Sequence, residues 1–133
     1  MQLFEIHVFI KSGDNIKQVP VCNVLMSRRQ TIDYTAVFQH LKTALDVEGE
    51  IMMEEAVLDF ESATWNSLRD VFPDVAIHGC IFHFVQGVYR RVQKLGLSVP
   101  YKKEKVKRNL IKKIYCLPFL PVRDMLAEFA NLK

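Results

Sequence analysis

Residues 56–61 of the chain read Ala-Val-Leu-Asp-Phe-Glu, and this stretch decides the expected fold. Its apolar lead-in predicts a buried strand, after which Asp59 stands directly before a helix. A second apolar lead-in, at 75–77, precedes residues 79–84, which read Gly-Cys-Ile-Phe-His-Phe. Open α/β sheets place their chemistry at strand ends of this kind. The carboxylate of Asp59 is therefore a candidate ligand for a divalent metal.

The residues before this stretch predict two strands and a helix. Two runs, 3–10 and 19–26, are rich in β-branched and aromatic residues, which is typical of antiparallel strands joined by a turn at 11–15. Pro20 is expected at the beginning of the second strand, because proline cannot donate to a ladder. Thr31 is expected to cap a helix that continues to Leu45.

The residues after it predict a third strand, a fourth strand and further helices. The third strand is expected over 51–58, followed by a helix that Pro73 ends. After the fourth strand at 75–77, a helix runs from Ile81 until Gly96 stops it. Pro100 is expected to separate a basic helix from it, and two further prolines separate a last helix. The order predicts an α/β fold.

Length and composition are those of one globular domain. The 133 residues are 50% hydrophobic and 25% charged. No apolar run approaches the roughly eighteen residues that span a bilayer, and the N-terminus lacks the features of a secretory signal. The three cysteines (Cys22, Cys80 and Cys116) are widely spaced and odd in number, which indicates a reducing, intracellular compartment.

Charge is distributed unevenly along the chain. Residues 1–89 carry 6 basic and 12 acidic residues, whereas residues 90–113 carry 10 basic residues and Glu104 as the one acid. Such a basic segment indicates a polyanionic partner, and the alternative is a solvated helical face. The candidate nucleic-acid contacts are Arg90, Arg91, Lys94, Lys102, Lys103, Lys105, Lys107 and Arg108, with Lys112 and Lys113 beyond them.

The order and spacing of these motifs resemble the transposase domain of Mutator-like elements (MULE). The matching segments are Gln2–His7, Pro20–Met26, the helix from Tyr34, Asp59–Ala63, Phe72-Pro73 and Gly79–Phe84, continued by Gln86, Arg90 and Leu95–Leu97. Asp-Phe-Glu alone would be a weak signal. Followed by Gly-Cys-x-Phe-His-Phe, it is a specific one.

The resemblance implies a fold and a chemistry. The fold is a partial RNase H-like mixed sheet (β-β-α-β-α-β) over residues 1–98, followed by the start of a helical insertion over 99–133. The chemistry is that of DDE transposases, in which three carboxylates hold two divalent metals, Mg²⁺ or Mn²⁺, for phosphoryl transfer. DNA is then the partner, no membrane is involved and the nucleus is the compartment.

The family pattern assigns roles to Asp59, Cys80 and His83, and helix electrostatics suggest a role for Glu61. Asp59 matches the second catalytic carboxylate, although such a residue taken alone is more often a helix N-cap. Glu61 is expected in the first turn of the helix, where the helix dipole favours an acid. Cys80 and His83 match a Cys-x-x-His pair and share a helical face. They could ligate a metal jointly, hydrogen-bond to each other or pack in the core; zinc would need two more ligands.

Two expected parts of a transposase core are absent from the sequence. The first catalytic Asp belongs to a central strand that would precede residue 2 and pair with both the 3–10 strand and the strand before Asp59. The third carboxylate lies beyond the insertion, and Glu128 is expected to be a solvated helix acid. With one carboxylate of three, the chain is expected to be a fragment that is not catalytic alone. The alternatives are a non-catalytic DNA-binding or interaction module, or a product without a biochemical role that aggregates through an open strand edge.

Overall fold

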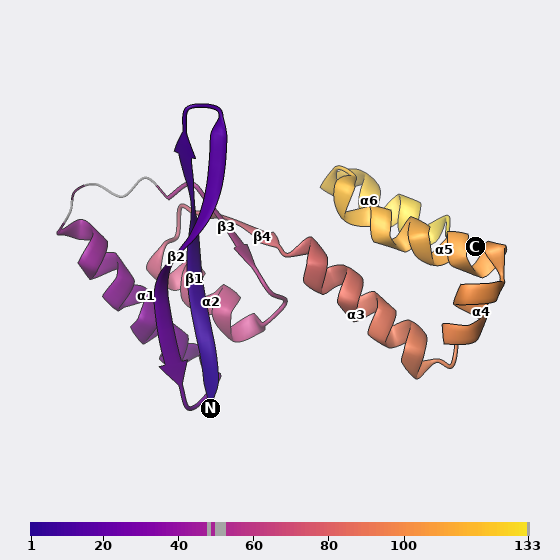
Figure 1. Ribbon diagram of the computed structural model, residues 1–133, viewed down its shortest axis with the longest axis horizontal. Coiled ribbons are helices and arrows are strands. Elements are labelled where there is room, and N and C mark those ends of the chain that lie inside the picture. The colour runs from indigo at the N-terminus through magenta and orange to yellow at the C-terminus, as the bar shows by residue number, and fades with distance from the viewer. Residues whose placement is uncertain (48, 50–52, 133) are drawn as a thin grey trace. The chain divides into compact units, whose positions relative to one another are not determined.

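The computed structural model describes residues 1–47, 49 and 53–132. The elements, in chain order, are β1 (Gln2–Ser12), β2 (Asn15–Met26), α1 (Thr31–Asp46), β3 (Glu55–Leu58), α2 (Ser62–Val71), β4 (Ala76–Gly79), α3 (Ile81–Lys94), α4 (Ser98–Lys103), α5 (Lys105–Cys116), the short 3-10 helix η1 (Leu117–Phe119) and α6 (Val122–Ala130) (Figure 1). This order confirms the predicted α/β fold. The start expected for the third strand, at 51 and 52, lies outside the described residues.

The chain divides into two compact units. Unit 1, Met1–Ile77, contains β1, β2, α1, β3 and α2. Unit 2, His78–Lys133, contains the helices from α3 onward, and β4 spans the division. The division at residue 98, which came from the family pattern, stays a prediction.

Strands β1 and β2 form a long antiparallel hairpin that turns at Gly13, where φ is +60°. Pro20 does not begin β2, as was expected, but lies inside it, opposite His7. The register shifts at this point, between Ile6 and His7. A bulge interrupts the ladder, so a residue that cannot donate a hydrogen bond is tolerated there.

The strands form two separate sheets within the part of the chain that the structure describes. One contains β1 and β2, and the other contains β3 and β4. The predicted β-β-α-β-α-β order is therefore found, with its strands divided between two small sheets. No ladder joins β1 to β3 among the described residues.

Two helix boundaries differ from those expected. The N-cap of α1 is Gln30 rather than Thr31, because the Asp33 carboxylate accepts a hydrogen bond from the Gln30 backbone N–H at 3.2 Å. Pro100 does not separate two helices but lies in α4, at its third residue. Proline is tolerated in a first helical turn, where its missing N–H would have no partner, so the break falls at Glu104 instead.

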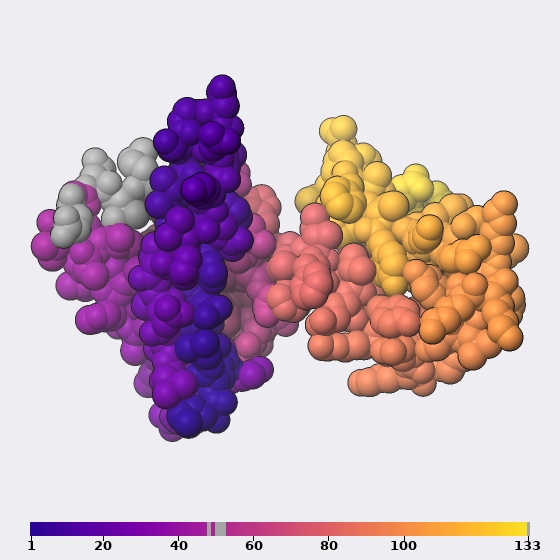
Figure 2. Space-filling view, viewed as in Figure 1, coloured from indigo at the N-terminus to yellow at the C-terminus, as the bar shows by residue number. Residues whose placement is uncertain are grey.

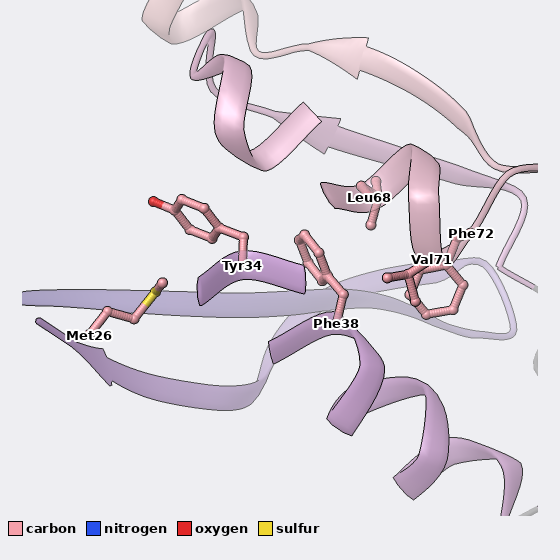
Figure 3. Close-up of a cluster of buried hydrophobic side chains, with 6 residues drawn as sticks. All are labelled: Met26, Tyr34, Phe38, Leu68, Val71 and Phe72. Carbon is pink, nitrogen blue, oxygen red and sulfur yellow. The ribbon is translucent and has the colours of Figure 1, made fainter. Parts of the chain in front are cut away.

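The core of unit 1 packs both helices against one face of the hairpin (Figure 3). Its buried side chains are Met26 from β2, Tyr34 and Phe38 from α1, and Leu68, Val71 and Phe72 from α2 and its end. The Phe4 ring of β1 meets the rings of Tyr34 and Phe38 edge-on, at centroid distances of 5.1 and 6.1 Å. The fully buried Ser67 hydroxyl lies 2.7 Å from the carbonyl oxygens of Thr31 and Ala63, which ties α2 to α1.

The far end of the hairpin extends beyond the helices of unit 1 (Figures 1 and 2). Large apolar side chains are exposed there, among them Phe9, Ile10 and Ile16. Because the core does not reach this end, substitutions at these positions are expected to change stability little.

In unit 2, the small buried core includes Val92 of α3 and Ile111 of α5. Three tyrosines support it: the rings of Tyr89 and Tyr101 meet edge-on at 5.8 Å, and Tyr115 lies beside them. Burial first, and the neighbouring Tyr101 second, raise the pKa of Tyr115 above its ordinary value. No helix in the described part of the chain is both long and apolar enough to cross a membrane.

Candidate metal-binding site at the end of strand β3

Asp59 follows directly on Leu58, the last residue of β3, and its side chain is exposed. The N-cap of α2 is Glu61, so the alternative interpretation of Asp59 as the helix cap is wrong. Glu61 was expected in the first turn of this helix, but it is the N-cap residue, one position before that turn. The carboxylate of Asp59 is thus placed at a strand end and is not used to cap the helix.

The backbone at Asp59 is tied to α2 by Trp65. The indole N–H of Trp65 donates a hydrogen bond to the Asp59 carbonyl oxygen at 2.5 Å. The rings of Phe60 and Trp65 are stacked, with centroids 6.3 Å apart, and the Arg69 guanidinium lies 5.3 Å from the Trp65 ring centroid. These contacts fix the turn that carries Asp59 at its N-terminal side.

A chain of hydrogen bonds fixes the C-terminal side of the same turn. Gln2 Nε2 lies 2.9 Å from the Tyr34 hydroxyl, and this hydroxyl lies 3.2 Å from Glu61 Oε1. Tyr34 is fully buried. Figure 3 shows its ring within the core cluster and its oxygen at the outer end of the ring. These two hydrogen bonds therefore connect the start of β1 to α1, and α1 to the beginning of α2.

The roles of Gln2, Tyr34 and Trp65 were not predicted from the sequence. The hydrogen-bonded partners Gln2, Tyr34 and Glu61 lie 32 and 27 positions apart, so no local spacing could reveal the contact. The available signal was that both Gln2 and Tyr34 fall in segments that match the family pattern.

The site fits a hard divalent cation. Mg²⁺ and Mn²⁺ prefer carboxylate oxygens and are commonly held by one or two carboxylates together with water and substrate phosphates. Asp59 offers such oxygens on a turn that is held at both ends. This chain's residues can therefore contribute one ligand of a magnesium site.

Cys80 and His83 lie at the beginning of α3. Cys80 is the N-cap residue, and His83 follows in the first turn; both are half-buried. The rings of His83 and Phe82 meet edge-on at 5.3 Å. Strand β4, which ends just before Cys80, is the neighbour of β3 in their sheet. As for the other thiols, Cys22 lies on β2 and Cys116 at the end of α5, where it is exposed.

The predicted nucleic-acid contacts lie on three helices of unit 2. Arg90, Arg91 and Lys94 belong to α3, Lys102 and Lys103 to α4, and Lys105, Lys107 and Arg108 to α5. All but one are exposed. The exception is Arg108, which is half-buried and donates a hydrogen bond to the Lys102 carbonyl oxygen at 3.3 Å. Lys107 forms an ion pair with Glu104 at 3.0 Å.

A family model described as MULE transposase domain matches residues 1–87 of the 133. The matched segment includes all of unit 1 and the positions of Asp59, Cys80 and His83. Searches of curated proteins and of solved structures gave no match.

Proposed function

Because this chain belongs to the family of MULE transposase domains, we propose that Asp59 is a metal ligand of a transposase that cleaves and joins DNA. When bound, a pair of divalent ions in such an enzyme activates the attacking hydroxyl and stabilises the leaving oxygen. Asp59 would contribute its carboxylate to this pair. Trp65 and Glu61 would hold the turn in the shape that presents it.

One observation carries this proposal. Asp59 stands at the end of β3, inside the segment that the family model matches, and both sides of its turn are fixed by contacts. The family pattern also supports the proposal, because Asp59 is the first residue of its Asp-Phe-Glu motif.

The chain alone is not proposed to catalyse the reaction. Its sequence supplies one of the three carboxylates that the family pattern requires, and phosphoryl transfer depends on positioning two metals and the substrate. The proposed activity is that of a transposase in which all three carboxylates are present. DNA is its proposed partner, and the nucleus its proposed compartment.

Cys80 and His83 are proposed to shape the region that follows β4. A thiolate and an imidazole on one helical face are donors that suit zinc better than magnesium. A structural zinc site takes four ligands, so this pair would form only half of one. Magnesium or manganese at Asp59 is accordingly the primary proposal.

Binding of Mn²⁺ to the 133-residue chain tests the role of Asp59. We expect Mn²⁺ to broaden the amide NMR signals of residues 58–61 at the lowest concentrations, and Asp59→Asn to remove this broadening. Asp70→Asn is the matched control, because Asp70 is an exposed acid on α2 outside the turn. Equal broadening in Asp59→Asn and wild type would contradict the proposal.

A second candidate function rests on a separate observation. Ten basic residues and one acid occur between positions 90 and 113, and most of the basic side chains are exposed on α3, α4 and α5. Such a surface is suited to DNA phosphates without sequence preference. This function would require no metal and no further carboxylate.

Salt-dependent DNA binding tests this second candidate. Replacing Lys102, Lys103 and Lys105 by Gln should weaken binding and lower the slope of log K against log salt by about 0.9 for each phosphate that the protein no longer neutralises. The control replaces Lys11 and Lys17 of the hairpin by Gln, which should leave the slope unchanged. Fluorescence anisotropy at several salt concentrations measures both. Binding that ignores salt in the wild type would exclude this function.

A further inference from the structure

We propose that Tyr34 is a positioning residue for the metal ligand Asp59, and this inference rests on the proposed metal-binding role of that residue. The observation behind it is the hydrogen-bonded series Gln2–Tyr34–Glu61. Glu61 is two residues after Asp59, so a contact that fixes Glu61 also restricts the turn between them. The metal itself would not touch Tyr34.

The direction of each hydrogen bond follows from the groups involved. An ionised carboxylate only accepts hydrogen bonds, so the Tyr34 hydroxyl must donate to Glu61 Oε1. The hydroxyl has one proton, so it must accept from Gln2, whose amide nitrogen is the donor. The series therefore delivers one defined hydrogen bond to the carboxylate of Glu61.

Tyr34 is suited to this role because its ring is packed inside the core of unit 1. It is fully buried and meets the Phe4 ring edge-on at 5.1 Å. Gln2 on β1 donates a hydrogen bond to the hydroxyl of Tyr34 on α1. The orientation of this hydroxyl therefore depends on both β1 and α1. Glu61 at the N-cap makes no side-chain capping bond, which leaves its carboxylate in the orientation that Tyr34 sets.

A restricted turn lowers the cost of ordering Asp59 when a cation binds. Residues that orient a metal ligand through hydrogen bonds typically change metal affinity by about 10–100-fold when they are removed. The Trp65 indole restricts the same turn from its other side, so the loss of Tyr34 alone should leave part of the effect. We expect a change near the lower end of this range.

The test compares Tyr34→Phe with Ser67→Ala in the Mn²⁺ titration of the 133-residue chain. Tyr34→Phe keeps the buried ring and removes the hydroxyl. Ser67→Ala is the matched control, because it removes another fully buried hydroxyl that joins α1 to α2 without contacting Glu61. We expect Tyr34→Phe to raise the Mn²⁺ concentration for half-maximal broadening at residues 58–61 about tenfold, and Ser67→Ala to leave it unchanged.

A pair of variants at Glu61 adds a test by rescue. Glu61→Gln keeps an oxygen that accepts from Tyr34, whereas Glu61→Ala removes it, so the first should retain more Mn²⁺ affinity than the second. Equal midpoints for Tyr34→Phe and Ser67→Ala would overturn the positioning role while leaving Asp59 as a ligand. Broadening that Asp59→Asn does not reduce would overturn both proposals.

Discussion

Phe38→Ala is expected to lower the free energy of unfolding of unit 1 by about 3–5 kcal/mol, the range for removing a buried aromatic side chain. Phe38 is 3% exposed and lies between Phe4 and the buried side chains of α2. Its removal leaves a cavity that two helices and a hairpin surround. Because Trp65 is the one tryptophan of the chain, its fluorescence during urea denaturation reports on unit 1.

Phe9→Ala is the matched control for this loss. Phe9 is 68% exposed and lies on the part of the hairpin beyond the core. Its truncation should change the free energy of unfolding by no more than about 0.5 kcal/mol. Should Phe38→Ala fail to fold, Phe38→Leu provides a smaller truncation at the same site. Similar losses at Phe38 and Phe9 would show that the core of unit 1 is not where the structure places it.

Asp59→Asn is expected to reduce metal-dependent strand transfer by about 1,000-fold or more in a complete transposase that contains this sequence. The amide is a weaker ligand than the carboxylate and does not offset the charge of the cation. Metal catalysis contributes several kcal/mol to such reactions, and each 1.36 kcal/mol corresponds to about a factor of ten in rate. Strand transfer of a labelled transposon end measures the loss.

Asp70→Asn serves as the control for this activity as well. Asp70 is an exposed acid on the same helix that follows Asp59, so its substitution changes the net charge by the same amount. We expect activity within about twofold of the wild type. An Asp59→Asn enzyme that keeps its activity would remove Asp59 from the catalytic site.

Much of the fold could be predicted because its signals are local. Runs of β-branched and aromatic residues, apolar residues at helical spacing and the turn residues predicted the order of strands and helices, and the stop at Gly96 was confirmed, with φ at +71°. The predicted ends of the helices were less accurate than their order. At α1 the capping interaction comes from Asp33, three residues after Gln30, and not from the Thr31 that local preference favoured.

The arrangement of the strands could not be predicted in the same way. Each strand was recognised from its own residues, but sheet formation depends on which strands are present together. Strands β1 and β3 belong to different sheets here. Pro20 was predicted at the beginning of its strand, because proline interrupts a regular ladder. In the structure a bulge accommodates it inside β2.

The position of Asp59 at a strand end could be predicted from the sequence, whereas the contacts that hold its turn could not. Asp59 was found from an apolar strand followed by a carboxylate, which is a pattern within six residues. The contacts that fix its turn come from Trp65, Tyr34 and Gln2, two of which lie more than 20 positions away. The contacts of Tyr34 and Gln2 arise from tertiary packing, so no spacing in the sequence indicates them.

If the side chain of residue 59 binds the catalytic metal, a change of its ligand atom should change the metal preference of the enzyme. Asp59→Cys in the complete transposase replaces a hard oxygen ligand by a thiolate, which prefers softer ions. We predict that strand transfer is lost with Mg²⁺ and recovers at least in part with Mn²⁺ or Cd²⁺. An Asp59→Cys enzyme with the same metal preference as the wild type would contradict the account.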